Sequence, residues 1–116
     1  MPANPVIITS LAPTGLGILT LTGASTAGVA GNVRYAGLIL GAPAWSSDGS
    51  QTAGAANVIV EYTGTAWKVS LGAAYLATKT SGAADPTGLT AWTVTTGTGS
   101  PVVAAGVLSP PPIITA

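Results

Sequence analysis

The sequence predicts an all-β fold, a small antiparallel β-sandwich or barrel with extended N- and C-terminal arms. Short stretches in which apolar and polar residues alternate are typical of half-buried strands. The 16 glycines and 9 prolines among 116 residues separate these stretches at intervals typical of turns. The abundant threonines and valines favour strands. Together these observations predict many short strands and require no helix.

The length indicates a single domain with one hydrophobic core. We expect an N-terminal arm over residues 1–12, a β domain over 13–108 and a proline-rich C-terminal arm over 109–116. Residues 6–9 of the first arm could form a short strand between prolines. Three consecutive prolines in the second arm predict a stiff polyproline II segment.

The first half of the β domain divides into strands at its glycines. We expect strands over 18–22, 32–35 and 38–40, with a bulge or turn at Gly37, and residues 42–45 follow them. Trp45 is expected to enter or cover the core. Residues 46–56 contain an Asp-Gly turn sequence and no large apolar residue, so they predict a loop.

The clearest element is a β-hairpin over residues 57–71. Loops of two or four residues would preserve the same alternation, and we favour the four-residue loop. That register sets Tyr62 opposite Trp67 on one face and Glu61 opposite Lys68 on the other. The hairpin therefore predicts an aromatic pair facing the core and an ion pair facing solvent.

The second half of the domain is less clearly patterned. Residues 73–80 could form a short helix, although a strand carrying Tyr75 is at least as well supported. We expect a loop, a strand, a turn and a last strand over 81–88, 89–95, 96–100 and 101–108.

Charge is scarce in this chain. Three Lys and Arg residues balance three Asp and Glu residues, which is 5% of the chain where an ordinary domain has roughly 25%. A neutral surface favours association, so we expect a homo-oligomer or a subunit of a larger assembly. Nucleic acid is not an expected partner, because three cations release few counterions. Glycines and prolines interrupt every apolar run, so no membrane partner is expected either.

Candidate catalytic and metal-binding groups are few. The chain has no His and no Cys, which excludes imidazole bases, thiolate nucleophiles and the metal sites that such ligands build. Asp48 and Asp85 lie in turn sequences, where turn formation is the ordinary role, and Glu61 is assigned to the hairpin pair. We therefore expect no enzyme activity, no catalytic or metal-binding residue and no cofactor.

The aromatic side chains provide the candidate interaction surface. Trp45, Tyr62, Trp67 and Trp92 could form a platform on which a sugar ring stacks, which makes a glycan a candidate partner. The alternative is that these rings fill the core, because the chain contains no Phe. We favour core packing for most of them.

The order of motifs also resembles a module that recurs in bacteriophage virion proteins. The resemblance covers roughly residues 19–103 and follows LTLTGA, GNVRYAG, GAPAW, VEYTGTAWKVS, AAYLAT and DPTGLTAWTVTTGTGSPVV. It implies a small β domain displayed on the virion, on a tail or as a capsid decoration, and no enzyme activity. The expected partners are a major virion protein or further copies of the chain, and the expected function is non-enzymatic capsid stabilisation or tail association. A carbohydrate-binding or adhesin module on a phage tail or cell surface is the alternative. Val33-Arg34-Tyr35 stands where the module more often has Asn-Gly-x-Tyr.

Overall fold

A computed structural model describes residues 12–13 and 15–106. The expected strand at 6–9 and both expected arms, apart from Ala12, lie outside these residues. The described chain forms eight strands and no helix, so the all-β prediction is confirmed. The strands are β1 (Ile18–Thr22), β2 (Gly31–Ile39), β3 (Ala42–Ser46), β4 (Val58–Tyr62), β5 (Ala66–Leu71), β6 (Tyr75–Thr80), β7 (Thr93–Thr96) and β8 (Val102–Ala105).

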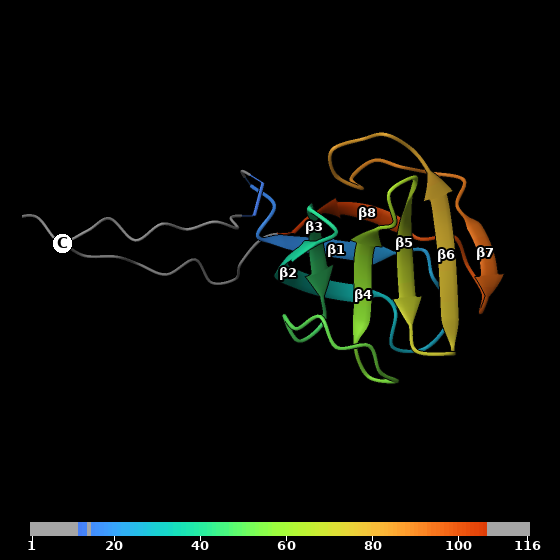
Figure 1. Ribbon diagram of the computed structural model, residues 1–116. Helices are drawn as coiled ribbons and strands as arrows, with labels where there is room; N and C mark the ends of the chain where they lie inside the picture. The colour runs from blue at the N-terminus through green and yellow to red at the C-terminus, as the bar shows by residue number, and fades with distance from the viewer. Residues whose placement is uncertain (1–11, 14, 107–116) are drawn as a thin grey trace, which may run out of the picture.

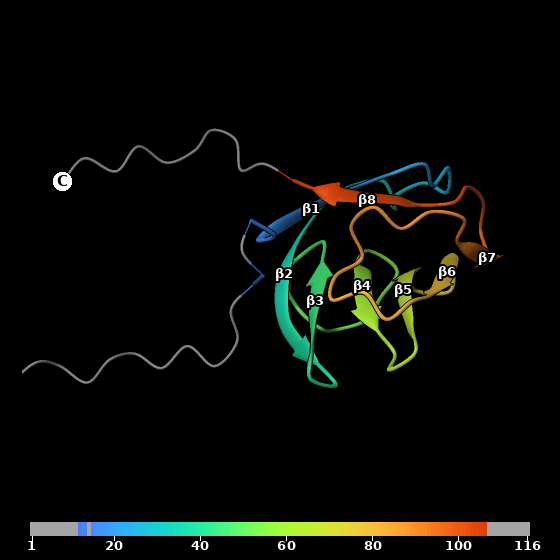
Figure 2. The same cartoon turned by 90° about the horizontal axis from the view of Figure 1, so that it is seen from above.

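All eight strands belong to one antiparallel sheet in the order β7-β6-β5-β4-β3-β2-β1-β8. The first seven strands follow one another as a meander, and the last returns to pair with β1. The sheet curls strongly, so that β8 and β1 lie above β4 and β5 in Figure 2 and the whole forms a half-barrel.

The predicted hairpin of β4 and β5 is confirmed in its register. Tyr62 pairs with Trp67 and Glu61 with Lys68 across a four-residue loop. The carbonyl of Ala66 accepts from the Thr63 amide at 2.8 Å, which closes the loop. The aromatic rings lie 5.1 Å apart between centroids, and the Lys68 Nζ to Glu61 Oε2 distance is 3.8 Å. The predicted bulge is also present, because the register between β2 and β3 shifts between Tyr35 and Gly37.

In the second half of the domain, the structure decides between a helix and a strand for residues 73–80 and shortens the strand expected over 89–95. Residues 75–80 form β6, a strand whose register with β5 is unbroken over six residue pairs, rather than a helix. The strand expected over 89–95 is shorter, because β7 begins only at Thr93. Ala91 has a positive φ of 56°, and this turn releases Trp92 from strand geometry so that its ring becomes buried.

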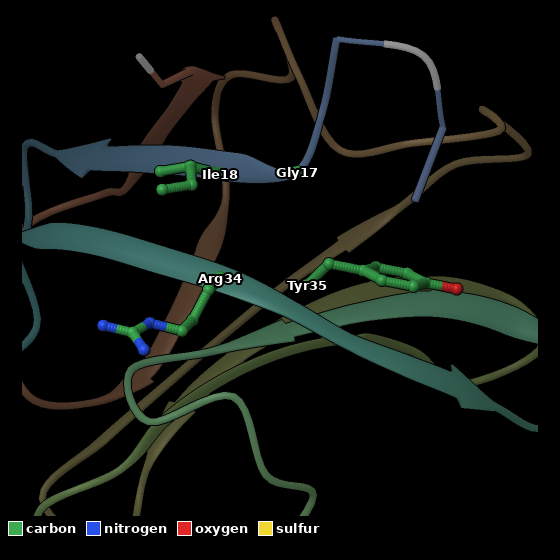
Figure 3. Close-up of a pocket in the computed structure, with 4 residues that line it drawn as sticks. All are labelled: Gly17, Ile18, Arg34 and Tyr35. Carbon is green, nitrogen blue, oxygen red and sulfur yellow. The ribbon is translucent and has the colours of Figure 1, made fainter. Parts of the chain in front are cut away.

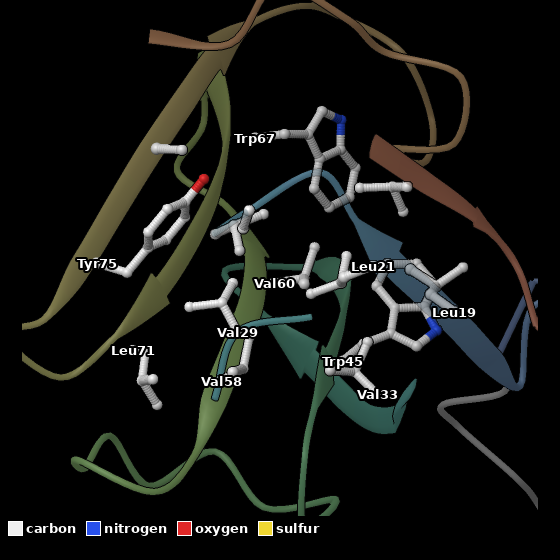
Figure 4. Packing of buried hydrophobic residues seen from close by; sticks show 14 of the residues in the cluster. Leu19, Leu21, Val29, Val33, Trp45, Val58, Val60, Trp67, Leu71 and Tyr75 are labelled. Atoms are coloured by element: carbon white, nitrogen blue, oxygen red, sulfur yellow. The ribbon is translucent and has the colours of Figure 1, made fainter. Parts of the chain in front are cut away.

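The core fills the concave side of the curled sheet (Figure 4). Leucines and valines from β1, β2, β4, β5 and β8 pack around Trp45, Trp67 and Tyr75, each of which is no more than 1% exposed. Val29 enters from the β1–β2 connection, and Trp92 enters from the β6–β7 connection. Three tryptophans and one tyrosine thereby supply the volume that phenylalanines supply in other cores.

Candidate functional site

The structure does not place the four aromatic candidates on one exposed surface. Trp45, Trp67 and Trp92 are 0%, 1% and 6% exposed. Each indole N–H donates to a backbone carbonyl, those of Leu16, Ala83 and Leu89 respectively. Only Tyr62 is half-buried. The burial of the three indoles agrees with the favoured expectation that most of these rings fill a core without Phe.

The carboxylates of Asp48 and Asp85 stabilise turns. Asp48 Oδ1 accepts from the Ser50 amide at 2.8 Å, and Asp85 Oδ1 accepts from the Thr87 amide at 2.9 Å. The Ser50 amide and hydroxyl, together with Ser46, hold the pKa of Asp48 below its usual value. Among the described residues, no group of three or more His, Cys, Asp or Glu side chains could hold a metal ion. The same residues include no helix that is long and apolar enough to cross a membrane.

The two terminal segments join the domain at the same place. The Gly106 amide donates to the carbonyl of Ile18 at 2.8 Å, so the end of β8 lies against the start of β1. Trp45 Nε1 donates to the carbonyl of Leu16 at 2.6 Å, which fixes the chain just before β1 to the core. Figure 1 shows both ends of the coloured chain on the same side of the sheet.

A cavity of about 390 Å³ lies beside this junction, where β2 continues past the start of β1. Its described lining consists of Gly17, Ile18, Arg34 and Tyr35 (Figure 3). The Tyr35 amide donates to the carbonyl of Gly17 at 2.9 Å, and the Tyr35 ring meets Trp45 edge-on at 6.0 Å between centroids. The rim of the cavity is therefore held by the sheet and by the core.

The free edges of the sheet are partly covered. Gly106 and Ile18 form a hydrogen-bonded pair between β8 and β1. Because every second residue of an antiparallel strand bonds to the same neighbour, the backbone N–H and C=O groups of Val103 and Ala105 point away from β1, toward the free edge. The Val103 carbonyl accepts from the Gly88 amide at 3.0 Å. The loop before β7 therefore covers part of the β8 edge, which limits where another strand could add.

Large apolar side chains are exposed at three described positions. Leu38, Leu40 and Val102 are 42%, 82% and 43% exposed. Leu40 lies at the turn between β2 and β3 with a positive φ of 51°, a conformation that leucine rarely adopts. Gln51 Nε2 donates to the carbonyls of Ala36 and Leu38, which fastens the projecting hairpin to the following loop.

Sequence reasoning did not identify the cavity residues as a site. Arg34 and Tyr35 occur in the GNVRYAG motif, but nothing in their spacing relates them to Gly17 and Ile18. The pairing of β1 with β2 brings the four together.

Comparison with known proteins gives no relative from which a function could be transferred. No family model matches the chain, and neither a curated protein nor a solved structure matches it.

Proposed function

We propose that this chain is a non-enzymatic structural subunit of a virus particle, of the bacteriophage type, that docks on the virion surface and self-associates. It would act as a capsid decoration and stabilising protein or as a tail-associated subunit. The resemblance of residues 19–103 to the virion module supports this class of function. The partner would be a major virion protein, further copies of the chain, or both.

The observation that carries the proposal is the junction of both terminal segments at one end of a closely paired β domain. Gly106 bonds to Ile18, and the preceding Leu16 is tied to Trp45. Segments outside the described domain can therefore attach it to a surface while the remainder of the half-barrel stays exposed. Extended segments of this kind can add to a neighbouring sheet through backbone hydrogen bonds.

The side chains of the described domain favour adhesion by shape and apolar contact. The whole chain contains six Lys, Arg, Asp and Glu side chains. Two of them, Glu61 and Lys68, form an ion pair with each other. The exposed Leu38 and Leu40 offer apolar area on a hairpin that Gln51 holds in place. Contact through these groups depends little on charge and should persist at high salt.

A glycan-binding role has less support. Its platform would be the faces of Trp45, Trp67 and Trp92, and these rings are packed inside the domain. Their indole N–H groups are also engaged by backbone carbonyls. We therefore retain the virion subunit as the proposed function.

Deletion of the gene from its parent virus tests the proposal. Particles without the protein should assemble and then lose resistance to heat or pressure, because the adhesive contacts between neighbouring subunits are gone. Added purified protein should restore the resistance. Deletion particles that keep full resistance and show no missing density would contradict the proposal.

Truncation separates docking from folding. Chains that lack residues 1–12 or 109–116 should dock less tightly on deletion particles, as measured by co-sedimentation. Their thermal unfolding should stay close to that of the full chain, because the core lies within residues 16–103. Undiminished docking by both truncated chains would show that attachment does not use the terminal segments.

A further inference from the structure

The hairpin of β2 and β3 ends in a turn whose leucine is unfavourable for the fold. Leu40 and Gly41 are its two central residues, and both have a positive φ, 51° and 79° respectively. Two-residue turns of this kind usually carry Asn or Asp before the Gly, because leucine is sterically strained at a positive φ. Leu40 is also 82% exposed, so burial within the domain does not offset the strain. A strained and exposed leucine points to a role in binding rather than in folding.

The residues around this turn are apolar on both faces of the hairpin. Residues 38–43, LILGAP, form the hairpin tip, and none of them has a polar side chain. Leu38 pairs with Pro43, and Ile39 pairs with Ala42. Because successive side chains of a strand point to opposite faces, these two pairs lie on opposite faces of the hairpin. An element that is apolar on both faces suits insertion into a pocket better than contact with a flat surface.

The loop after β3 holds the hairpin tip in place. Gln51 Nε2 donates to the carbonyl of Ala36 at 2.9 Å and to the carbonyl of Leu38 at 3.0 Å. Both carbonyls belong to β2, at the point where this strand leads into the tip. Figure 2 shows the turn at the margin of the sheet, on the side away from β1 and β8. A tip that is already fixed loses little conformational freedom on binding, which favours affinity.

We propose that the hairpin tip inserts into an apolar, uncharged pocket of the major virion protein, with Leu40 as its anchor. This site rests on the proposed docking function, to which it adds a surface and the chemistry of its partner. The tip has no ionisable side chain. A charged pocket would therefore lose its hydration without gaining an ion pair.

Two other occupants fit the described surface less well. A second copy would have to offer an apolar recess, but the concave side of its sheet is filled by its own core (Figure 4). Outside the hairpin, Val102 is the only large apolar side chain that is exposed among the described residues. Segments that bind a lipid surface usually combine apolar residues with Lys, Arg or Trp. The tip contains none of these, and the three tryptophans of the chain are buried.

Substitution of Leu40 tests the site on the full chain, with virus particles that lack the protein as the probe. Leu40→Asn removes the apolar anchor and relieves the strained turn. From the contribution of a fully buried leucine, we expect docking measured by co-sedimentation to weaken about 10- to 100-fold. The same variant should unfold at a higher temperature than the original chain, which excludes misfolding as the cause of weaker docking.

Two further variants are matched controls. Leu40→Met keeps an apolar side chain in the same turn and should retain most of the docking. Val102→Thr replaces the exposed apolar side chain on β8 and should dock within about twofold of the original chain. Equal docking by Leu40→Asn and Val102→Thr would overturn the proposal. A loss with Leu40→Met as large as that with Leu40→Asn would also overturn it, because the contact would then not depend on apolar character.

Two other probes identify the occupant. Phosphatidylcholine vesicles that bind the original chain but not Leu40→Asn would show insertion into lipid. Weaker self-association of Leu40→Asn in sedimentation, with full docking on particles, would show contact with a second copy. Either result would overturn the proposal. An original chain that binds no particle would contradict the proposed function as well, whereas particles that bind Leu40→Asn as tightly as the original chain and regain heat resistance would overturn the role of the tip alone.

Discussion

Replacing Tyr75 with phenylalanine tests how the sheet holds the segment between β7 and β8. Tyr75 is fully buried, and its hydroxyl donates to the carbonyl of Gly99 at 2.5 Å. Tyr75→Phe removes this bond and leaves the ring in place. Since Gly99 is half-buried, water can partly replace the lost donor, and the expected loss is about 1 kcal/mol of unfolding free energy. For a domain of this size that corresponds to a decrease of about 4–8 °C in Tm.

Chemical unfolding monitored by tryptophan fluorescence measures this loss. Tyr62→Phe is the matched control, because Tyr62 is half-buried and its hydroxyl bonds to no residue in the described ranges. That variant should stay within about 0.5 kcal/mol of the original chain. If Tyr75→Phe and Tyr62→Phe unfold at the same denaturant concentration, the Tyr75 hydroxyl does not stabilise the connection and the reasoning fails.

The pH dependence of stability gives a second readout of Tyr75. Burial raises the pKa of Tyr75 above its ordinary value of 10.0. The unfolded chain then releases the tyrosine proton first, so stability is lost as the pH rises from about 10 through the higher folded pKa. Tyr75→Phe lacks this loss. Unfolding free energies of the two chains that run parallel between about pH 9 and about pH 11 would contradict this explanation.

Three further substitutions test local features of the fold. Leu40→Asn should stabilise the chain by about 0.5–1 kcal/mol, because asparagine tolerates the positive φ of this exposed turn, and a lower Tm would contradict it. Asn57→Ala should cost about 1–3 kcal/mol in urea unfolding, since the buried Asn57 amide donates to the carbonyl of Thr52 at 2.8 Å; a loss below about 0.5 kcal/mol would refute this role. Separating the partly exposed Glu61 and Lys68 pair by Glu61→Gln should change the unfolding free energy by less than about 1 kcal/mol, and a larger effect would show that the pair is not an ordinary surface contact.

The hairpin of β4 and β5 shows how much of this fold local patterning can predict. Its register, its four-residue loop and its two cross-strand pairs all follow from alternation and turn sequence. The bulge at Gly37 could likewise be anticipated, because a glycine interrupts an otherwise regular strand pattern. These features depend on residues close together in the chain.

The start of β7 and the burial of the tryptophans could not be predicted from local patterning. The alternation of residues 89–95 predicts a strand, but burial of Trp92 is reached through a turn at Ala91. Tryptophan can serve either as core volume or as an exposed platform, and only its packing distinguishes the two. The burial of Ser46 could not be predicted from local patterning either. It depends on the loop after β3, in which the Ser46 hydroxyl donates to the carbonyl of Ser50.

The sequence by itself determined the all-β class, the hairpin of β4 and β5 and the scarcity of charge. Only the tertiary structure decided that β8 returns to pair with β1 and that β2 continues past the start of β1. That arrangement places Gly106 against Ile18 and creates the cavity next to Arg34 and Tyr35. The physical reason is that alternation specifies which residues share a face of a strand, whereas the pairing of distant strands depends on how the whole sheet curls to bury its core.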